Sequence, residues 1–314
     1  MTEADPGAPG SVALVVNPTA GKGRARALLP QVVGRLRHAG HQVETLLSRT
    51  PDEAAGLVDG AVRSGADVVA VMGGDGMLHL GVNAVAEHRQ QHPTGPALGL
   101  LPAGTGNDLA RGIGLDPHDT VAAADVIAGG RTRPLDLLRV SGRYVGTVVA
   151  SGFDSLVNRR ANAMTWPRGS GRYTFATLAE LRTFSPLSYR LTIDGEPREL
   201  DAMLIAVGNT SSYGGGMRIC PSADATDGWL DVTIIHPISR LKLLQLLPQM
   251  RSGRFARDAC VEQLRARVVR IDGDGLLGYG DGEELGAAPM LVESCPAALN
   301  VCVPASSEAA RAVA

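Results

Sequence analysis

The chain has 314 residues, of which 44% are hydrophobic and 20% are charged, and its formal net charge at pH 7 is −2. A chain of this length can bury a large core and is expected to form two domains rather than one. The composition excludes a disordered polyelectrolyte, and the charge gives no reason to expect nucleic acid as a partner.

From residue 11 to about residue 136, short apolar runs alternate with longer segments of helical periodicity. The predicted strands are 12–16, 42–47, 67–72 and 97–102, and the predicted helices are 24–39, 51–64 and 78–88. Strands that are buried on both faces are continuous apolar runs, so this alternation predicts a parallel sheet with helices on either side. The first half is therefore predicted to be an α/β domain.

The second half contains strand-like runs and few helices. Helices are predicted over 173–184 and 241–251, the latter as core packing. A hairpin turn is predicted at Asp194-Gly195, because Asp-Gly accepts the left-handed conformations that such turns require. With a boundary near Asp136, residues 137–295 are predicted to form a mostly β domain.

Three predicted strands of the first half end in glycine-rich loops, NPTAGKGRA (17–25), GGDGMLH (73–79) and AGTGNDLAR (103–111). Ligands of an open α/β sheet bind beyond the carboxyl ends of the strands, where the first turns of the helices present unpaired N–H groups. The loops add the cation Lys22 and the carboxylate Asp75. This combination suits a polyphosphate with Mg²⁺.

The standard nucleotide fingerprints do not match these loops. The Walker pattern fails around Lys22, which is followed by glycine, and G-x-G-x-x-G fails in both later loops. For a single loop, glycines that only form a strand-to-helix turn are an equally good explanation. Three such loops at three strand ends favour a phosphate cradle of another kind.

These three motifs, in this order, resemble the catalytic domain shared by diacylglycerol kinases and sphingosine or ceramide kinases, in particular the soluble bacterial diacylglycerol kinase group. In the second half, SGFDS, GNTSSYGGGMRICPSADATDGWLDV and GYGDGEEL are similar to the same group. The likeness covers about residues 11–304. It implies a Rossmann-like, NAD-kinase-like α/β domain over 11–136, to which about 296–304 return, a C-terminal β-sandwich domain over 137–295, and ATP in a cleft between them.

The resemblance also implies a set of nucleotide-binding residues. They are Asn17, Pro18, Thr19, Ala20, Gly21, Lys22, Ser48, Gly73, Gly74, Asp75, Gly76, Met77, Leu78, His79 and Thr105, with Ser48 the weaker match. Met77 stands where the family usually has threonine, which removes one hydroxyl that could bond a phosphate or the loop. Asp75 would hold the catalytic Mg²⁺ on ATP.

The stretch YGDGEEL (279–285) offers a catalytic group. Phosphoryl transfer needs positioning, charge neutralisation and a group that takes the proton of the acceptor hydroxyl. Asp281 and Glu283 are two residues apart, so their side chains can point the same way if the turn keeps strand alternation. The resemblance makes Glu283 the general base with Asp281 beside it. Taken alone, this stretch would more simply be a solvated hairpin.

The stretch SADATDGWLDV (222–232) contains three aspartates and is a candidate oxygen-rich cation site. By resemblance, Asp227 would bind a structural Mg²⁺ through its side chain, and the carbonyl groups of Asp224 and Trp229 would complete the site. An Asp-Gly turn that precedes a strand and binds no metal is the alternative.

The sequence gives a weaker indication of which residues contact lipid. Residues 159–182 mix five arginines with aromatic and apolar residues against the single acid Glu180. Such a segment can lie on an anionic membrane surface, although a surface helix packed on its own domain is the slightly favoured interpretation.

The N-terminus and the cysteines indicate the compartment. The first ten residues have the acids and prolines that a signal peptide lacks, and no segment has about 18 uninterrupted apolar residues. The four cysteines form no C-x-x-C pair, so reduced thiols are expected. The sequence predicts a cytoplasmic protein that touches a membrane at most peripherally.

The predicted function is ATP-dependent transfer of the γ-phosphate to a lipid hydroxyl, foremost that of diacylglycerol, to give phosphatidic acid in phospholipid biosynthesis. ATP and Mg²⁺ are the predicted cofactors. The alternatives are another lipid alcohol such as a sphingoid base or a polyprenol, an NAD kinase with a related GGDG loop, and an idle nucleotide- or lipid-binding protein, which Met77 alone supports. A homodimer is compatible with the sequence, which does not fix the oligomeric state.

Overall fold

The computed structural model describes residues 10–164, 176, 179–180 and 184–305. The chain divides into two compact units, one formed by the residues up to Asp136 together with those from Pro296 onward, and the other by Leu137–Cys295. The helix predicted over 173–184 and most of the arginine-rich segment 159–182 lie outside the described residues.

The first unit is built on a parallel sheet. Its strands are β1 (Ser11–Val16), β2 (Gln42–Leu47), β3 (Val68–Gly73) and β4 (Ala97–Pro102), in the order β2-β1-β3-β4, and Val301 near the end of β16 (Met290–Cys302) pairs in parallel with Leu98 of β4. β1, β3 and β4 are buried along almost their whole length. Their continuous apolar runs follow from this burial on both faces.

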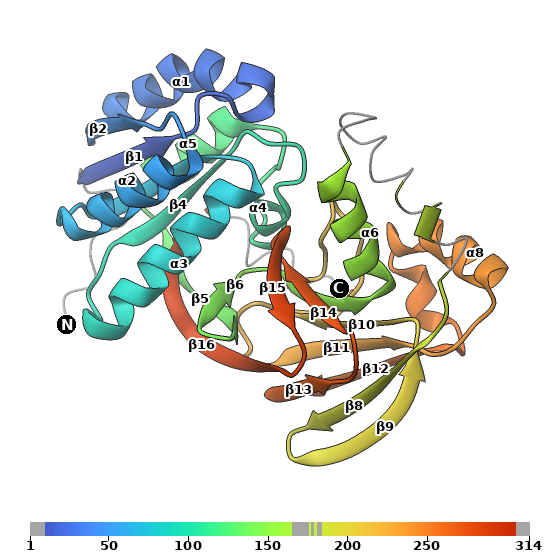
Figure 1. Cartoon of the computed structure of the whole chain (residues 1–314). Helices are drawn as coiled ribbons and strands as arrows, with labels where there is room; N and C mark the ends of the chain where they lie inside the picture. The colour runs from blue at the N-terminus through green and yellow to red at the C-terminus, as the bar shows by residue number, and fades with distance from the viewer. Residues whose placement is uncertain (1–9, 165–175, 177–178, 181–183, 306–314) are drawn as a thin grey trace. The chain divides into compact units, whose positions relative to one another are not determined.

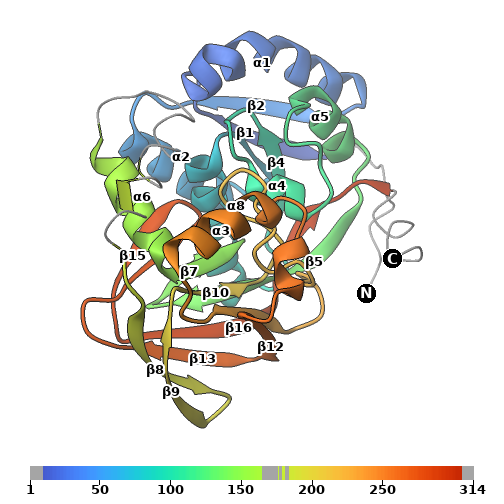
Figure 2. The ribbon, with the colours of Figure 1, turned by 90° about the vertical axis from the view of Figure 1, so that its right-hand side faces the viewer.

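Helices cover both faces of this sheet. Figure 1 and Figure 2 show α1 (Ala20–His38) and α5 (Thr120–Ala128) on one face and α2 (Pro51–Arg63) and α3 (Asp75–Gln91) on the other, while the short α4 (Asp108–Gly112) follows β4. The predicted α/β class is confirmed. The sequence analysis did not predict α5, whose small alanines give little helical periodicity.

The second unit contains two groups of strands. The six-stranded sheet has the order β12-β11-β10-β7-β14-β15 and consists of β7 (Val148–Gly152), β10 (Leu204–Gly208), β11 (Leu230–Ile235), β12 (Val261–Ala266), β14 (Leu277–Gly280) and β15 (Glu283–Ala287). In the other group, the beginning of β16 pairs with β13 (Val268–Asp272), β13 pairs with β8 (Leu187–Ile193), and β8 pairs with β9 (Glu196–Ala202). The strand β5 (Thr132–Val140) pairs with β16 and with β6 (Arg143–Val145).

The side chains of the six-stranded sheet alternate between two cores. Leu230, Val232 and Ile234 of β11 pack in a core that also contains residues of β8, β13 and β16, whereas Ile235 packs in a second core on the opposite face. Successive residues of a strand point to opposite faces, so a fully buried strand contributes to both cores. The predicted β-sandwich is confirmed.

Helices cover the opposite face of the six-stranded sheet. They are α6 (Phe153–Ala163), α8 (Arg240–Met250) and the 3₁₀ turn η1 (Arg254–Arg257). Phe153, Leu246 and Phe255 contribute to the core beneath them. None of the helices in the described part of the chain has the length and apolar character that a membrane span requires.

Candidate active site

The three glycine-rich loops of the first unit touch one another through their backbones. A Cβ atom at Gly21 would overlap the carbonyl oxygen of Ala103, and a Cβ atom at Gly104 would overlap the Cα atom of Gly74. Ala103 also donates its backbone N–H to the carbonyl of Gly73 at 2.7 Å. These glycines therefore allow close approach between loops, which a simple strand-to-helix turn does not require.

Asp75, the first residue of α3, ties the second loop to the third. Its carboxylate accepts the backbone N–H of Asn107 at 3.0 Å and that of Asp108 at 2.9 Å. Asn107 has a left-handed backbone, with φ of 54°, and its side-chain amide donates to the carbonyls of Gly104 and Pro117. The sequence analysis did not identify Asn107 as a site residue, although asparagine is one of the few residues that tolerate this conformation.

The first loop bends sharply before α1. Gly21, Lys22 and Gly23 have φ angles of 59°, 60° and 90°, so the regular helix begins near Arg24, as predicted. Thr19 donates its hydroxyl to the side chain of Asn17 at 2.8 Å. Lys22 is exposed. The loop therefore presents a cation and polar groups at the carboxyl end of β1.

The remaining predicted nucleotide-binding residues differ in their exposure to solvent. Thr105 and Gly76 are exposed, Pro18, Ala20, Gly74 and His79 are half-buried, and Gly73, Met77, Leu78 and Ser48 are buried. Met77 is only 5% exposed and its side chain lies against Gly73. Ser48 donates its hydroxyl to the carbonyl of Val16 at 3.2 Å. The side chains of Met77 and Ser48 therefore serve packing and the sheet.

In the second unit, the stretch that contains Glu283 is a two-residue hairpin turn between β14 and β15. Asp281 and Gly282 have φ angles of 51° and 86°, and Gly280 pairs with Glu283 across the turn. Glu283 is the exposed first residue of β15. Left-handed residues interrupt strand alternation, so the condition that would place both carboxylates on one side is not met.

The carboxylate of Asp281 is directed into the unit. It accepts the backbone N–H groups of Gly146 and Thr147 at 2.8 and 3.1 Å, and the hydroxyl of Thr147 at 2.5 Å. The carbonyl of Thr147 in turn accepts the backbone N–H of Asn209 at 2.8 Å. Asp281 thus fixes the turn that carries Glu283 and connects it to the GNTSS stretch. The sequence analysis did not identify Gly146 or Thr147 as site residues.

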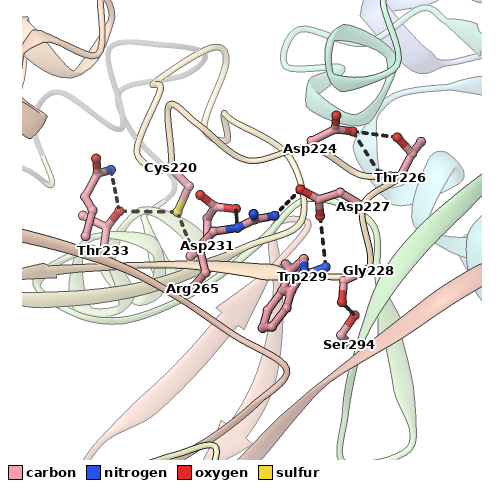
Figure 3. A network of polar contacts seen from close by, with 11 residues as sticks. Cys220, Asp224, Thr226, Asp227, Gly228, Trp229, Asp231, Thr233, Arg265 and Ser294 are labelled. Carbon is pink, nitrogen blue, oxygen red and sulfur yellow. Dashed lines mark hydrogen bonds and ion pairs between the residues drawn. The ribbon is translucent and has the colours of Figure 1, made fainter.

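The aspartate loop is held by an arginine (Figure 3). Asp227 accepts the backbone N–H of Trp229 at 3.0 Å and forms an ion pair with Arg265, which also lies 3.8 Å from Asp231. Asp231 is 8% exposed, and burial raises the pKa of its carboxyl to about 6, against the lowering effect of Arg265. Asp224 accepts the backbone N–H and the hydroxyl of Thr226.

The ion pair with Arg265 places a positive charge beside the Asp227 carboxylate that would have to hold Mg²⁺. The carbonyl of Asp224 accepts the backbone N–H of Thr226 at 2.8 Å. Within the described residues, no cluster of three or more His, Cys, Asp or Glu side chains is arranged to hold a metal ion. A structural Mg²⁺ on Asp227, Asp224 and Trp229 therefore stays a prediction that requires Arg265 to move.

We expect Arg265→Met to lower the free energy of unfolding by about 1–2 kcal/mol, because it leaves Asp227 and Asp231 without their cation, while solvent screens part of this loss. Urea unfolding measures the change. Arg270→Met is the matched control, since Arg270 is equally exposed and lies 3.8 Å from Asp272. We expect this control to stay within about 0.5 kcal/mol of the wild type. Equal losses in the two variants would contradict a special role for Arg265.

The chain matches two family models that together cover most of its length. Residues 11–140 match the diacylglycerol kinase catalytic domain, and residues 147–303 match the YegS C-terminal NAD kinase beta sandwich-like domain. The first match contains the three glycine-rich loops, and the second contains the Asp281–Glu283 turn and the aspartate loop.

Several named proteins are similar over nearly the whole chain. A protein of Mycobacterium tuberculosis named diacylglycerol kinase is 41% identical over 94% of this chain and 96% of its own length. A diacylglycerol kinase of Bacillus subtilis is 26% identical over 88% and 90%. A protein of Stenotrophomonas maltophilia named "Probable lipid kinase YegS-like" is 29% identical over 91% and 94%.

A solved structure shares the fold. The crystal structure of a diacylglycerol kinase from Bacillus anthracis superposes with a TM-score of 0.75 at 23% identity, over 94% of this chain and 98% of that one. This likeness shows the shared fold, whereas the two family models and the identity to the mycobacterial relative show the family. The chain belongs to the diacylglycerol kinase catalytic-domain family of lipid kinases, phosphotransferases with an alcohol group as acceptor.

Proposed function

We propose that this protein transfers the γ-phosphate of ATP to the free hydroxyl of diacylglycerol and so produces phosphatidic acid for phospholipid biosynthesis. The observation that carries the proposal is the mutual contact of the three loops at the carboxyl ends of β1, β3 and β4, held by Asp75. Such an end of a parallel sheet binds phosphate groups. The name of the mycobacterial relative supports diacylglycerol as the acceptor.

In this proposal the first unit binds the nucleotide. The backbone groups of 17–22 and 73–79, together with Thr105, surround the phosphates, and the exposed cation Lys22 offsets their charge. Met77 contributes its backbone alone, because its side chain is buried against Gly73. The absence of a threonine hydroxyl at this position therefore affects affinity more than the reaction itself.

Asp75 fits the role of the group that holds the catalytic Mg²⁺. Mg²⁺ prefers carboxylate oxygens and substrate phosphates as ligands, and the Asp75 carboxylate lies between two of the loops assigned to the phosphates. Each carboxylate oxygen has more than one acceptor site, so bonds to backbone N–H groups are compatible with this role. Mg²⁺ bound there would neutralise charge on the transferred phosphate.

The second unit supplies the base. Glu283 is exposed at the start of β15, on a turn that Asp281 anchors, so it is available to accept the proton of an alcohol. Asp281 is assigned a positioning role, since its oxygens accept three hydrogen bonds from Gly146 and Thr147. The protein would act in the cytoplasm, in peripheral contact with the membrane that contains its acceptor.

Another lipid alcohol is the second candidate, because the name of the Stenotrophomonas maltophilia relative specifies a lipid kinase and no acceptor. Transfer of labelled γ-phosphate from Mg·ATP should be measured in detergent–lipid mixed micelles with diacylglycerol, a sphingoid base and a polyprenol, and with NAD in solution. We expect labelled phosphatidic acid with diacylglycerol. A labelled product with another lipid alcohol would change the acceptor, a labelled NAD product would change the function, and ATP binding without any product would indicate a binding protein.

A further inference from the structure

The helix α8 has a buried face and an exposed apolar face. Leu243, Leu246 and Met250 are buried in the core beneath the helix. Leu241 and Leu244, by contrast, are 66% and 41% exposed. Residues three and four apart are neighbours on a helix surface, so these two leucines and the exposed Pro248 form one apolar strip. Single exposed leucines are common, but a strip of this kind on a surface helix is not needed for packing.

Exposed arginines follow this strip at the C-terminal end of α8. Arg251 follows Leu244 by seven residues and therefore lies two turns further along the same face, and Arg254 and Arg257 follow on η1. Asp258 is the only acidic residue between 237 and 260, and it pairs with Lys242. A strongly cationic surface segment thus occurs in a chain whose net charge is −2.

We propose that the face defined by Leu241, Leu244, Pro248 and Arg251, and continued by Arg254 and Arg257, docks on an anionic lipid surface. The leucines would enter the boundary between headgroups and acyl chains, and the arginines would bind lipid phosphates. The proposal rests on the proposed function, because a kinase of diacylglycerol must reach an acceptor that stays in lipid. Figure 2 shows α8 in front of the strands of the six-stranded sheet.

Within the second unit, the loop that contains residues 209–218 contacts the end of α8 and, through Thr147, the turn that carries the proposed base. The carbonyl of Met250 accepts the backbone N–H of Arg218 at 2.8 Å, directly after the loop of Tyr213 and Met217, which pack on the core under α8. The same stretch begins at Asn209, whose N–H bonds Thr147, the partner of Asp281.

The test measures binding of the full-length chain to vesicles by sedimentation. The vesicles contain phosphatidylcholine alone or phosphatidylcholine with phosphatidylglycerol. We expect the wild type to prefer the anionic vesicles, and Leu241→Gln/Leu244→Gln to bind them at least about tenfold more weakly. Arg251→Gln/Arg254→Gln should weaken binding by about fivefold per arginine and reduce its salt dependence. Circular dichroism and the melting temperature verify that the variants fold. Both should be unchanged, because the substituted side chains are exposed.

Matched controls remove leucines elsewhere. Leu47 is 51% and Leu291 is 40% exposed, so Leu47→Gln/Leu291→Gln removes comparable apolar surface outside α8 and should leave vesicle binding unchanged. Phosphorylation of a short-chain diacylglycerol in detergent micelles should be the same in the wild type and both leucine pairs. If the wild type does not phosphorylate diacylglycerol in micelles, the proposed function is refuted, whatever the result for vesicle binding.

Three results would overturn the docking proposal. In the first, the wild type phosphorylates the micellar substrate but does not bind anionic vesicles. In the second, the α8 leucine pair and the wild type bind anionic vesicles equally. The third is a concentration-dependent dimer in lipid-free solution that the α8 leucine pair abolishes, because the face would then be an interface with a second copy of this chain.

Discussion

Glu283→Gln is expected to lower kcat for phosphoryl transfer by about 10²- to 10⁴-fold, the usual contribution of a general base. Glutamine has nearly the same shape as glutamate but cannot take the proton of the acceptor hydroxyl. Glu283 is exposed, so the substitution should leave folding and ATP binding intact. Initial rates with saturating Mg·ATP in mixed micelles measure the effect, and kcat and kcat/KM should fall together.

Glu284→Gln provides the matched control on the same strand. Glu284 is also exposed and accepts the hydroxyl of Tyr279 at 2.6 Å, but successive strand residues point to opposite faces. This control should change kcat by no more than a few-fold. If the two variants lose activity equally, or if Glu283→Gln keeps full activity, then Glu283 is not the base.

Gly104→Ala is expected to lower the free energy of unfolding by about 1–3 kcal/mol and to abolish measurable ATP binding. The added Cβ atom would overlap the Cα atom of Gly74 and approach the side-chain oxygen of Asn107 to 3.0 Å. A backbone atom cannot rotate away as a flexible side chain can, so the second and third loops must separate. Urea unfolding and calorimetric titration with Mg·ATP measure the two effects.

Gly60→Ala is the control for this variant. Gly60 lies within α2, and a Cβ atom there would meet no atom within 4 Å. Alanine is the better helix former by about 1 kcal/mol, so the control should be as stable as the wild type or more stable and should bind ATP normally. Normal stability and ATP binding in Gly104→Ala would show that the loops are not in backbone contact.

Local patterns predict the elements of the first unit well. The strands β2 and β4 begin and end where predicted, because glycine, proline and serine lie next to them in the chain. The hairpin at Asp194 and Gly195 is confirmed by φ angles of 49° and 92°. The prediction that α8 is core packing holds only for one of its faces, since periodicity identifies a helix but not which apolar residues the rest of the fold covers.

The contacts that organise the candidate site join residues far apart in the chain. Asp281 bonds Thr147, which is 134 residues away, and Arg265 pairs with Asp227 across 38 residues. Sequence periodicity carries no information about such pairs, so neither partner was predicted. The sequence analysis recognised a hairpin at Asp281-Gly282 as the simpler interpretation, but it did not use the left-handed conformations that Asp-Gly favours in such a turn, which would have predicted the loss of strand alternation between Asp281 and Glu283.

The return of β16 to the first unit has a consequence for how the chain folds during its synthesis. Val301 pairs with Leu98 of β4, so the edge of β4 receives this partner only when the last part of the described chain has left the ribosome. Until then the nascent first unit has an unpaired strand edge, which is a site for aggregation. A fragment that stops at Asp136 would keep that edge permanently, so we expect the first unit to mature only once β16 has been synthesised, together with the second unit.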